Sequence, residues 1–298
     1  MHSNGQSTNV LVASVLTKLD DYRYWRDEKL ANAPTQLSDC IVEIQNPFDL
    51  SSAEKNKIIS LCQKGNFALF QIQPIDQYDK AIVSINTQFG LKDFDQHLFV
   101  KTGGLAHITQ NDKKDQGEFI PYTDKNLGWH TDGYYNAVEQ RIRAFSLFCV
   151  EPAAQGGVNE WVDPQMMYLL LREDNLDVVK ALTHPEAMSI PEHKVDGKVR
   201  RATSTGPIFF IDEPTNELSM RYTQRKKNID FLDSLEIKQA VEHLDALLNT
   251  TTDYHFEHLM QTGQGLLCNN VLHKRNAFTD DNDNPRLLLR GRYFNRIE

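Results

Sequence analysis

Apolar positions recur with a helical period at several places along the chain, mostly near its ends. In 10–30, residues Val12, Val15, Leu16 and Leu19 fall at i, i+3, i+4 and i+7 with polar residues between them, which predicts an amphipathic helix. Ser51 to Glu54 has the capping pattern that begins a second helix. The other expected helices cover 77–89, 164–171 and 234–248.

The centre and the end of the chain instead carry short apolar or alternating runs bounded by glycine, proline and polar residues, which predict strands. We therefore expect a mainly β fold with flanking helices, a cupin-like double-stranded β-helix or jelly-roll barrel. Residues 1–8 are polar and expected to be disordered, and 9–298 are expected to form one domain with a helical insertion at about 164–250. The expected strands cover 40–44, 67–72, 142–150, 158–163, 208–211, 218–222, 266–268 and 287–289.

Composition narrows the class of protein. The 298 residues are 40% hydrophobic and 24% charged, which is ordinary for a globular chain. A net charge of −9 argues against nucleic acid or an anionic membrane as partner, and no apolar run approaches the roughly 18 residues of a membrane span. The four cysteines form no CxxC pair and the N-terminus has no signal-peptide pattern. We therefore expect neither a disulfide framework nor structural zinc. The expected location is the reducing cytoplasm.

Four His-x-acid triplets are candidates for a metal site, and their contexts separate them. The triplet at 184–186 contains a proline and predicts a turn, and the one at 243–245 lies in an expected helix, where residues i and i+2 do not share a face. The one at 255–257 comes too soon before His273 to leave room for an intervening barrel, so we interpret it as a surface strand. The triplets are His130/Asp132, His184/Glu186, His243/Asp245 and His255/Glu257.

His130 and Asp132 stand at an expected strand end, where residues i and i+2 point the same way and can grip one ion. A later histidine, His273, completes two histidines and one carboxylate, a set that leaves open positions on Fe(II) for a co-substrate and oxygen. Arg286 follows at the start of an apolar strand. Its permanently charged, two-pronged guanidinium suits a cofactor that carries a free carboxylate.

With these motifs in this order, over residues 40–298, the chain resembles the Fe(II)/2-oxoglutarate-dependent oxygenases of the taurine dioxygenase (TauD/TfdA) family. Within the family it resembles most the gamma-butyrobetaine and trimethyllysine hydroxylases. Three departures are visible: Asn269-Asn270 replaces a common Asp-Asn pair, a zinc-binding N-terminal extension has no counterpart, and Gly291 and Tyr293 sit one residue late. The matching motifs lie in 122–135, 156–163 and 272–293.

The resemblance implies roles for individual residues. His130, Asp132 and His273 would ligate Fe(II), and Arg286 would hold the distal carboxylate of 2-oxoglutarate. Asn159 occupies a position where the family often has a threonine that assists that carboxylate. With O2 as the further co-substrate, the expected products are succinate, CO2 and a hydroxylated molecule. Related halogenases lack the carboxylate ligand, so the presence of Asp132 disfavours halogenation.

The sequence indicates the substrate only coarsely. Aromatic rings beside the metal triplet can hold a quaternary ammonium, and arginines can bind a carboxylate, sulfonate or phosphonate. Ordinary packing explains the same residues, so both interpretations stay open. We expect a small zwitterion, amino-acid-like molecule or organic acid, and a homo-oligomer, a dimer or tetramer, from the resemblance. The candidate substrate residues are Trp129, Tyr134, Tyr135, Arg275, Arg290 and Arg292.

Three alternatives remain. A protein or peptide hydroxylase would keep the chemistry but present an open groove. A non-catalytic barrel that serves binding or assembly would not need the set of His130, Asp132, His273 and Arg286. A metal-dependent lyase or isomerase of cupin type would not need Arg286.

Overall fold

The computed structural model describes the whole chain except residues 1–17, 97–99, 111–119, 196, 226 and 282. The chain folds into two compact units, one rich in strands and one rich in helices. The expected disorder of residues 1–8 falls outside the described residues, and the expected single domain over 9–298 stays a prediction. The strand-rich unit comprises Pro34–Asp163, Tyr222–Arg225 and Thr251–Glu298, and the helix-rich unit comprises Met1–Ala33, Pro164–Arg221 and Lys226–Thr250.

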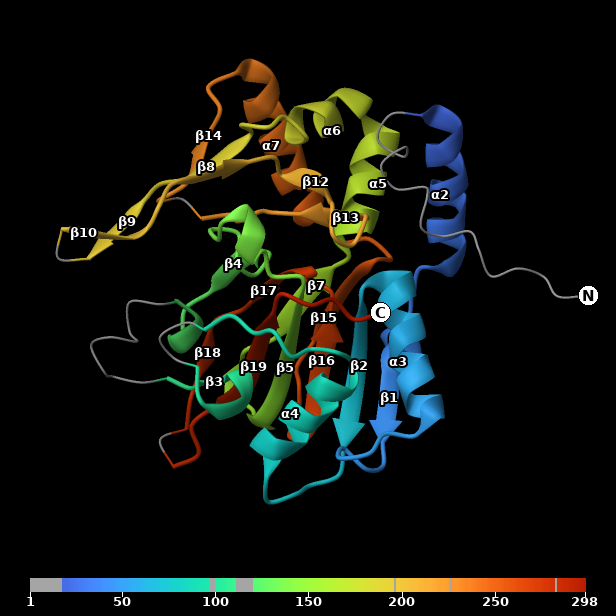
Figure 1. Ribbon diagram of the computed structural model, residues 1–298, viewed down its shortest axis with the longest axis vertical. Coiled ribbons are helices and arrows are strands. Elements are labelled where there is room, and N and C mark those ends of the chain that lie inside the picture. The colour runs from blue at the N-terminus through green and yellow to red at the C-terminus, as the bar shows by residue number, and fades with distance from the viewer. Residues whose placement is uncertain (1–17, 97–99, 111–119, 196, 226, 282) are drawn as a thin grey trace, which may run out of the picture. The chain divides into compact units, whose positions relative to one another are not determined.

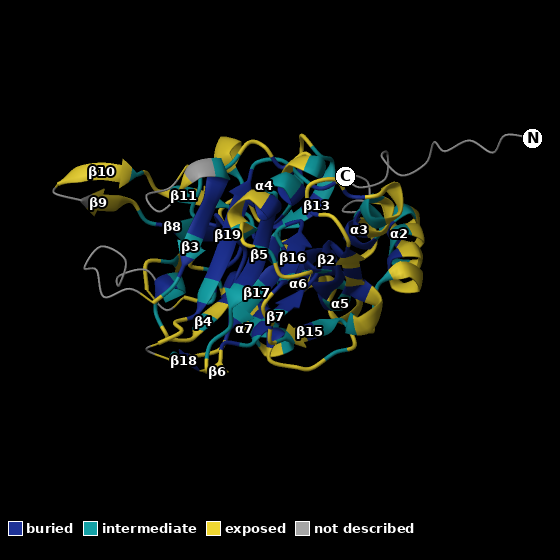
Figure 2. Ribbon diagram, turned by 90° about the horizontal axis from the view of Figure 1, so that it is seen from below, coloured by how far each residue is buried: buried dark blue, intermediate teal, exposed yellow. Residues whose placement is uncertain are grey.

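The strand-rich unit is built on a six-stranded sheet whose central strands are almost fully buried (Figures 1 and 2). β1 and β2 pair in parallel, and every other pair is antiparallel. The predicted strands at 40–44, 67–72, 142–150, 266–268 and 287–289 are all present. In sheet order the strands are β1 (Ile41–Ile44), β2 (Phe67–Ile72), β16 (Gln264–Cys268), β5 (Ala144–Glu151), β19 (Leu287–Tyr293) and β3 (Leu105–Ile108).

A second, four-stranded sheet faces the first across an aromatic core. The ring of Phe67 lies 5.4 Å from that of Trp161 and 4.9 Å from that of Phe256, measured between centroids. The short strands β6 (Gln155–Gly156) and β18 (Phe278–Thr279) pair beside it. The order of the second sheet is β15 (His255–His258), β7 (Asn159–Val162), β17 (Leu272–Arg275) and β4 (Leu127–His130).

These two sheets confirm a mainly β fold with helices. They do not close into a barrel among the described residues, because the six-stranded sheet ends at β1 and β3 and the four-stranded sheet at β15 and β4. The expected jelly-roll barrel is therefore not shown as a closed structure.

Two helices of the strand-rich unit follow the predicted pattern, and α3 (Ser52–Gly65) shows why. The Ser51 side chain accepts from the Glu54 backbone and the Glu54 carboxylate accepts from the Ser51 backbone, which satisfies two otherwise unpaired amides. The helix is terminated by Asn66, whose φ of 61° lies in the left-handed region and is incompatible with a right-handed helix. α3 packs on β1 and β2, and α4 (Tyr78–Gln88) packs on β5 (Figure 1). Single 3-10 turns are η1 (Leu37–Cys40), η2 (Thr102–Gly104), η3 (Ile120–Tyr122) and η4 (Val138–Gln140).

The helix-rich unit contains α2 (Leu19–Asn32), α5 (Pro164–Asp174), α6 (Leu176–Leu182) and α7 (Leu235–Leu248). α2 lies against α5, where the Tyr22 hydroxyl donates to Glu173 at 2.6 Å. Of the expected helix at 10–30, the described part is α2, which begins at Leu19 after the extended residue Lys18. Positions 10–17 of that prediction lie outside the described residues. The strands predicted at 208–211 and 218–222 are present as a hairpin of β12 (Phe209–Asp212) and β13 (Glu217–Met220). Short strands not predicted from sequence add a three-stranded sheet of β11 (Ser204–Gly206), β8 (Met188–Ile190) and β14 (Asp230–Phe231), and a hairpin of β9 (His193–Val195) with β10 (Lys198–Arg201).

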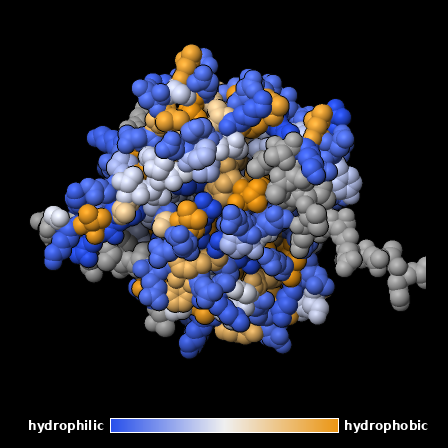
Figure 3. Space-filling view, turned by 45° about the horizontal axis from the view of Figure 1, so that its top comes forward, coloured by the Kyte–Doolittle hydropathy of each residue, from blue (hydrophilic) through white to orange (hydrophobic). Residues whose placement is uncertain are grey.

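The surface fits the composition. The face seen in Figure 3 is mostly hydrophilic, with hydrophobic side chains in small separate groups. Within the part of the chain that the structure describes, no helix has both the length and the apolar character needed to cross a membrane. The expectation of a cytoplasmic location stays a prediction.

Candidate active site

The antiparallel pairing of β4 and β17 brings the two predicted histidine ligands together. His130, the last residue of β4, is the register partner of His273 on β17, and their ring centroids are 4.2 Å apart. Asp132 lies two residues beyond His130, with Oδ1 at 4.0 Å from His130 Nε2. Ligand atoms of all three residues lie within 4.8 Å of one another. The cluster is the one group of three or more metal-ligating side chains found in the described part of the chain.

Backbone hydrogen bonds orient both imidazoles in the same way. Nδ1 of His130 lies 2.9 Å from the carbonyl of Gly128, and Nδ1 of His273 lies 2.9 Å from the carbonyl of Val271. A carbonyl only accepts, so each Nδ1 carries the proton and each Nε2 keeps its lone pair. Such outer hydrogen bonds fix the tautomer of metal-binding histidines.

Burial and charge keep these three side chains in the protonation states that bind metal. Burial, helped by His273, lowers the pKa of His130 to about 3, and burial also lowers the pKa of His273. Burial opposes ionisation of Asp132, but Arg290 and Arg292 outweigh it and hold the pKa of that carboxyl below its ordinary value. Asp132 Oδ2 is buried without a hydrogen-bond partner. A cation would satisfy this orphaned oxygen, so the donor set fits a metal ion.

The other three triplets form no such cluster. His184 lies in a turn, where its Nδ1 accepts from the Glu186 amide at 3.1 Å, as the sequence predicts. His243 lies on α7 and contacts Asp174 at 2.8 Å. His255 lies on β15, where its Nε2 is 3.2 Å from Glu160 Oε2. Each of the three histidines instead lies beside a separate carboxylate or amide.

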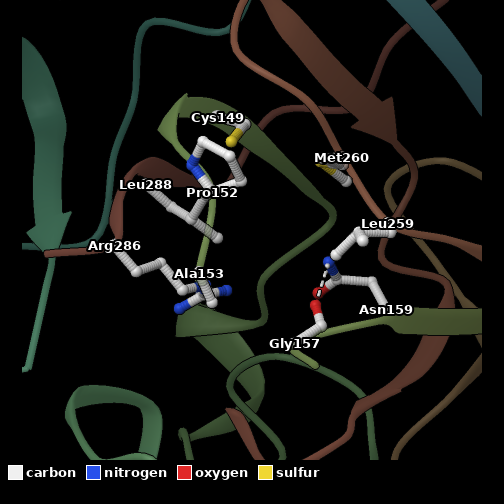
Figure 4. A pocket seen from close by; sticks show the side chains of 9 residues that line it. All are labelled: Cys149, Pro152, Ala153, Gly157, Asn159, Leu259, Met260, Arg286 and Leu288. Atoms are coloured by element: carbon white, nitrogen blue, oxygen red, sulfur yellow. Dashed lines mark hydrogen bonds between the residues drawn. The ribbon is translucent and has the colours of Figure 1, made fainter. Parts of the chain in front are cut away.

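Arg286 lines a pocket within the strand-rich unit, and Asn159 lies across from it (Figure 4). Arg286 is only 4% exposed, and burial lowers its pKa to about 10. Its guanidinium lies over the ring of Phe278 at 4.9 Å but forms no hydrogen bond or ion pair with any described residue. The Asn159 amide reaches only the Gly157 carbonyl, at 3.4 Å. An unpaired buried cation and an underused amide in one pocket are the features of a carboxylate site.

Two further arginines of β19 lie beside the metal cluster. Arg290 Nη1 is 3.9 Å from Asp132 Oδ1, and Arg290 Nε is buried without a partner. Arg292 donates to the Tyr135 hydroxyl at 2.9 Å and to Asp95. Burial alone would lower the pKa of Arg292, but Tyr135, Asp132 and Asp95 raise it above its ordinary value. The guanidinium of Arg292 is thus held by hydrogen bonds to protein groups, whereas that of Arg290 keeps N–H donors available to a ligand.

The remaining candidate substrate residues differ in their placement. The Tyr134 ring is 6.4 Å from that of His130, and its hydroxyl accepts from Arg225 at 2.9 Å. Trp129 is not brought to the cluster: adjacent strand residues face opposite ways, and its ring packs on His255 and under Lys274.

Arg275 is occupied by the backbone. Its guanidinium donates to the carbonyls of Pro121, Thr123 and Lys125 and lies 4.8 Å from the ring of Phe278. As with the other candidate site residues, its assignment as a substrate contact stays a prediction.

Sequence reasoning missed how the loop after β4 is held. Thr131 exchanges hydrogen bonds with Tyr222, at 3.0 and 3.1 Å, which attaches this loop to a segment 91 residues away. Gly133 turns the chain with a φ of 67°, at a point where a Cβ would lie 2.5 Å from Ile142. The glycine is visible in the sequence, but the pairing with Tyr222 has no local signal.

Two histidines and a carboxylate in one buried cluster, with a basic carboxylate pocket in the same unit, define a class of mononuclear iron oxygenases that use a 2-oxo acid. Comparison with known proteins places the chain within that class. The model of the family "Taurine catabolism dioxygenase TauD, TfdA family" matches residues 27–292. The chain therefore belongs to the TauD/TfdA family and is an Fe(II)- and 2-oxoglutarate-dependent oxygenase.

Individual relatives are more distant. A uridine-5'-phosphate dioxygenase of Streptomyces sp is 26% identical over 223 residues, which cover 72% of this chain and 79% of that protein. An asparagine oxygenase in complex with Fe(II), 3-hydroxyasparagine and succinate superposes with a TM-score of 0.61 at 14% identity, covering 96% of this chain and 89% of that one. A taurine dioxygenase from Burkholderia xenovorans gives 0.56 at 16% identity, covering 86% of each chain. At these identities the two structures show the fold alone.

Proposed function

We propose that this oxygenase hydroxylates a small polar molecule that carries an acidic group. In this proposal His130, Asp132 and His273 hold Fe(II), while Arg286 and Asn159 hold the distal carboxylate of 2-oxoglutarate. When bound, the iron and 2-oxoglutarate supply an oxidative decarboxylation that places one atom of O2 in succinate and the other in the substrate. The protein's own contribution is to position these groups and to provide a fixed set of charges around them.

The unneutralised positive charge of Arg290 is the observation that supports an acidic substrate. Arg292 is neutralised by Asp95, and Arg286 is reserved for 2-oxoglutarate. Asp132 would be engaged by the metal, so Arg290 would keep a buried charge without its own partner. Buried charges are stable only when paired, and a carboxylate, sulfonate or phosphate of the substrate would supply the partner.

The relatives support this class of substrate. The proteins that resemble the chain are named for uridine 5'-phosphate, asparagine and taurine, all of which are small molecules with an acidic group. The closer resemblance to gamma-butyrobetaine and trimethyllysine hydroxylases finds no support among these comparisons. A quaternary ammonium is also disfavoured electrostatically, because the hydroxyls of Tyr134 and Tyr135 both accept from arginines.

The proposal extends to the architecture of the enzyme. We infer that the two facing sheets are the two walls of a jelly roll and that the helical segment at about 164–250 is an insertion within one oxygenase domain, in keeping with the family match across 27–292. A dimer or tetramer is the expected assembly.

Purified protein with Fe(II), 2-oxoglutarate and ascorbate tests the proposal. We expect slow formation of succinate without substrate, and faster formation with one of a panel of amino acids, sulfonates and nucleoside monophosphates. The stimulating compound should gain the mass of one oxygen atom. Succinate formation no higher than that of His130→Ala would refute the oxygenase assignment. Stimulation only by peptides, or only by neutral compounds, would refute the substrate class.

A further inference from the structure

Asn270 occupies an unusual position between β16 and β17, two residues before β17 begins. Its φ is 50°, in the left-handed region that few residues other than glycine and asparagine adopt readily. This conformation turns the chain between the two strands and directs the Asn270 side chain to the loop that follows β4.

The Asn270 amide brackets the backbone of Asp132 from both sides. Its Oδ1 accepts from the Asp132 amide at 2.8 Å, and its Nδ2 donates to the Asp132 carbonyl at 3.0 Å. The second proton of Nδ2 goes to the carbonyl of Ile142 at 2.7 Å. One side chain therefore joins the two ends of the loop that runs from Asp132 to Ile142, from a position 138 residues away from Asp132.

No other described residue performs this task for Asp132. β4 ends at His130, and the pairing with Tyr222 stops at Thr131. Among the described residues, both hydrogen bonds of the Asp132 backbone go to Asn270. The carboxylate of the cluster is thus carried by a loop residue, whereas both histidines are carried by paired strands.

We propose that Asn270 is the positioning residue for the carboxylate ligand: it holds Asp132 at the distance and direction that the metal requires. This inference rests on the proposed metal site of His130, Asp132 and His273. Replacing a residue that orients a metal ligand through a hydrogen bond typically lowers the affinity for the metal by about 10- to 100-fold. The same range is expected for the loss of the Asn270 amide.

The neighbouring residue provides a matched control. Asn269 is also an asparagine and also bridges a distant backbone with its amide, although it is buried whereas Asn270 is half-buried. It accepts from the Ile297 amide at 2.9 Å and donates to the Ile297 carbonyl at 3.2 Å, which holds the C-terminal tail and not the metal cluster. Its loss should therefore lower the stability of the fold without altering the metal site.

The test compares Asn270→Gly, Asn270→Asp and Asn269→Gly in the full chain, using Mn(II) as an oxygen-stable probe. Glycine tolerates the left-handed backbone, so Asn270→Gly removes the amide without adding strain. Asn270→Asp keeps the acceptor for the Asp132 amide but loses both donors. Calorimetric titration gives the Kd for Mn(II), and thermal unfolding without metal reports the fold.

We expect Asn270→Gly to weaken Mn(II) binding by about 10- to 100-fold, and Asn270→Asp to weaken it by a smaller factor. Asn269→Gly should lower the melting temperature and keep the wild-type Kd. Wild-type affinity in a folded Asn270→Gly or Asn270→Asp protein, or an equal loss in Asn269→Gly, would overturn the role of Asn270. If the wild type bound Mn(II) no better than His130→Ala, the proposed metal site itself would be wrong.

Discussion

Replacing Arg286 by methionine removes a buried positive charge that no described residue neutralises, while keeping a long side chain in the pocket. Burial lowers the pKa of Arg286 from its ordinary value of 12.5 to about 10. Since one pKa unit corresponds to about 1.4 kcal/mol, the charged guanidinium is held at a cost of roughly 3 kcal/mol. We expect Arg286→Met to raise the free energy of unfolding of the ligand-free protein by about 1–3 kcal/mol.

The same substitution should have the opposite effect on 2-oxoglutarate. A dicarboxylate in this pocket would pair with the guanidinium and recover the cost of burying it. Breaking a buried ion pair by removing one partner typically costs about 3–5 kcal/mol. The Kd for 2-oxoglutarate should therefore rise by roughly a hundred- to a few thousand-fold, while the Kd for the metal changes little.

Arg275 offers a matched control, because it lies against the same phenylalanine ring as Arg286. Both guanidinium groups lie over the ring of Phe278, at 4.8 and 4.9 Å, both residues are 4% exposed, and burial lowers both pKa values to about 10. The donors of Arg275, however, are already bound to backbone carbonyls. Arg275→Met should destabilise the fold by about 1–3 kcal/mol for each buried carbonyl left unpaired, and keep the wild-type Kd for 2-oxoglutarate.

The measurements are chemical denaturation of the metal-free proteins and anaerobic titration of 2-oxoglutarate into the Fe(II)-loaded proteins. The reasoning is refuted if Arg286→Met is less stable than the wild type, since the charge would then have a partner. It is equally refuted if Arg286→Met and Arg275→Met lose the same affinity for 2-oxoglutarate.

Asn159, Arg290 and the four cysteines give three further tests. Asn159→Leu should raise the Kd for 2-oxoglutarate about tenfold, because a hydrogen bond to a charged group contributes about 1.5 kcal/mol, and Asn159→Thr should retain most of the affinity; equal values for the two variants would remove Asn159 from the pocket's function. Arg290→Met should keep substrate-independent succinate formation but raise the KM of a stimulating acidic substrate about 100-fold, and an unchanged KM would contradict the charge argument. The four cysteines are buried, and burial raises the pKa of Cys40 to about 11 and those of Cys62 and Cys149 to about 12. At pH values below 9, the ordinary pKa of a thiol, the cysteines are protonated in both the folded and the unfolded chain, and the fold keeps its full stability. Stability should fall as the pH rises from 9 towards 12, because in this range only the unfolded chain ionises. Denaturation curves measured between pH 9 and pH 12 check the direction of this change in stability. The Cys149→Ala variant is the comparison, and its stability should decline less steeply with pH.

Much of the local structure is written in the sequence. The capping box at Ser51 and the helical period behind it place α3, and the long apolar run at 142–150 places β5. These elements are predictable because their stabilising contacts lie within a few residues or depend only on which face is apolar. The short strands β8 to β11 have no such signal, since their residues are largely polar and they exist by pairing with one another.

The candidate site divides along the same line. The sequence alone selected the candidate residues for the chemistry: His130, Asp132, His273 and Arg286 stand out by type, spacing and order. Only the tertiary structure decided which donors are free. Arg275 and Arg286 are indistinguishable as letters, and they differ because the carbonyls of 121–125 fill one guanidinium and leave the other empty.

The tertiary structure likewise decided that His130 meets His273 while Trp129, one residue earlier, faces away. Strand register and burial set both outcomes, and these properties arise between segments more than 100 residues apart in the chain.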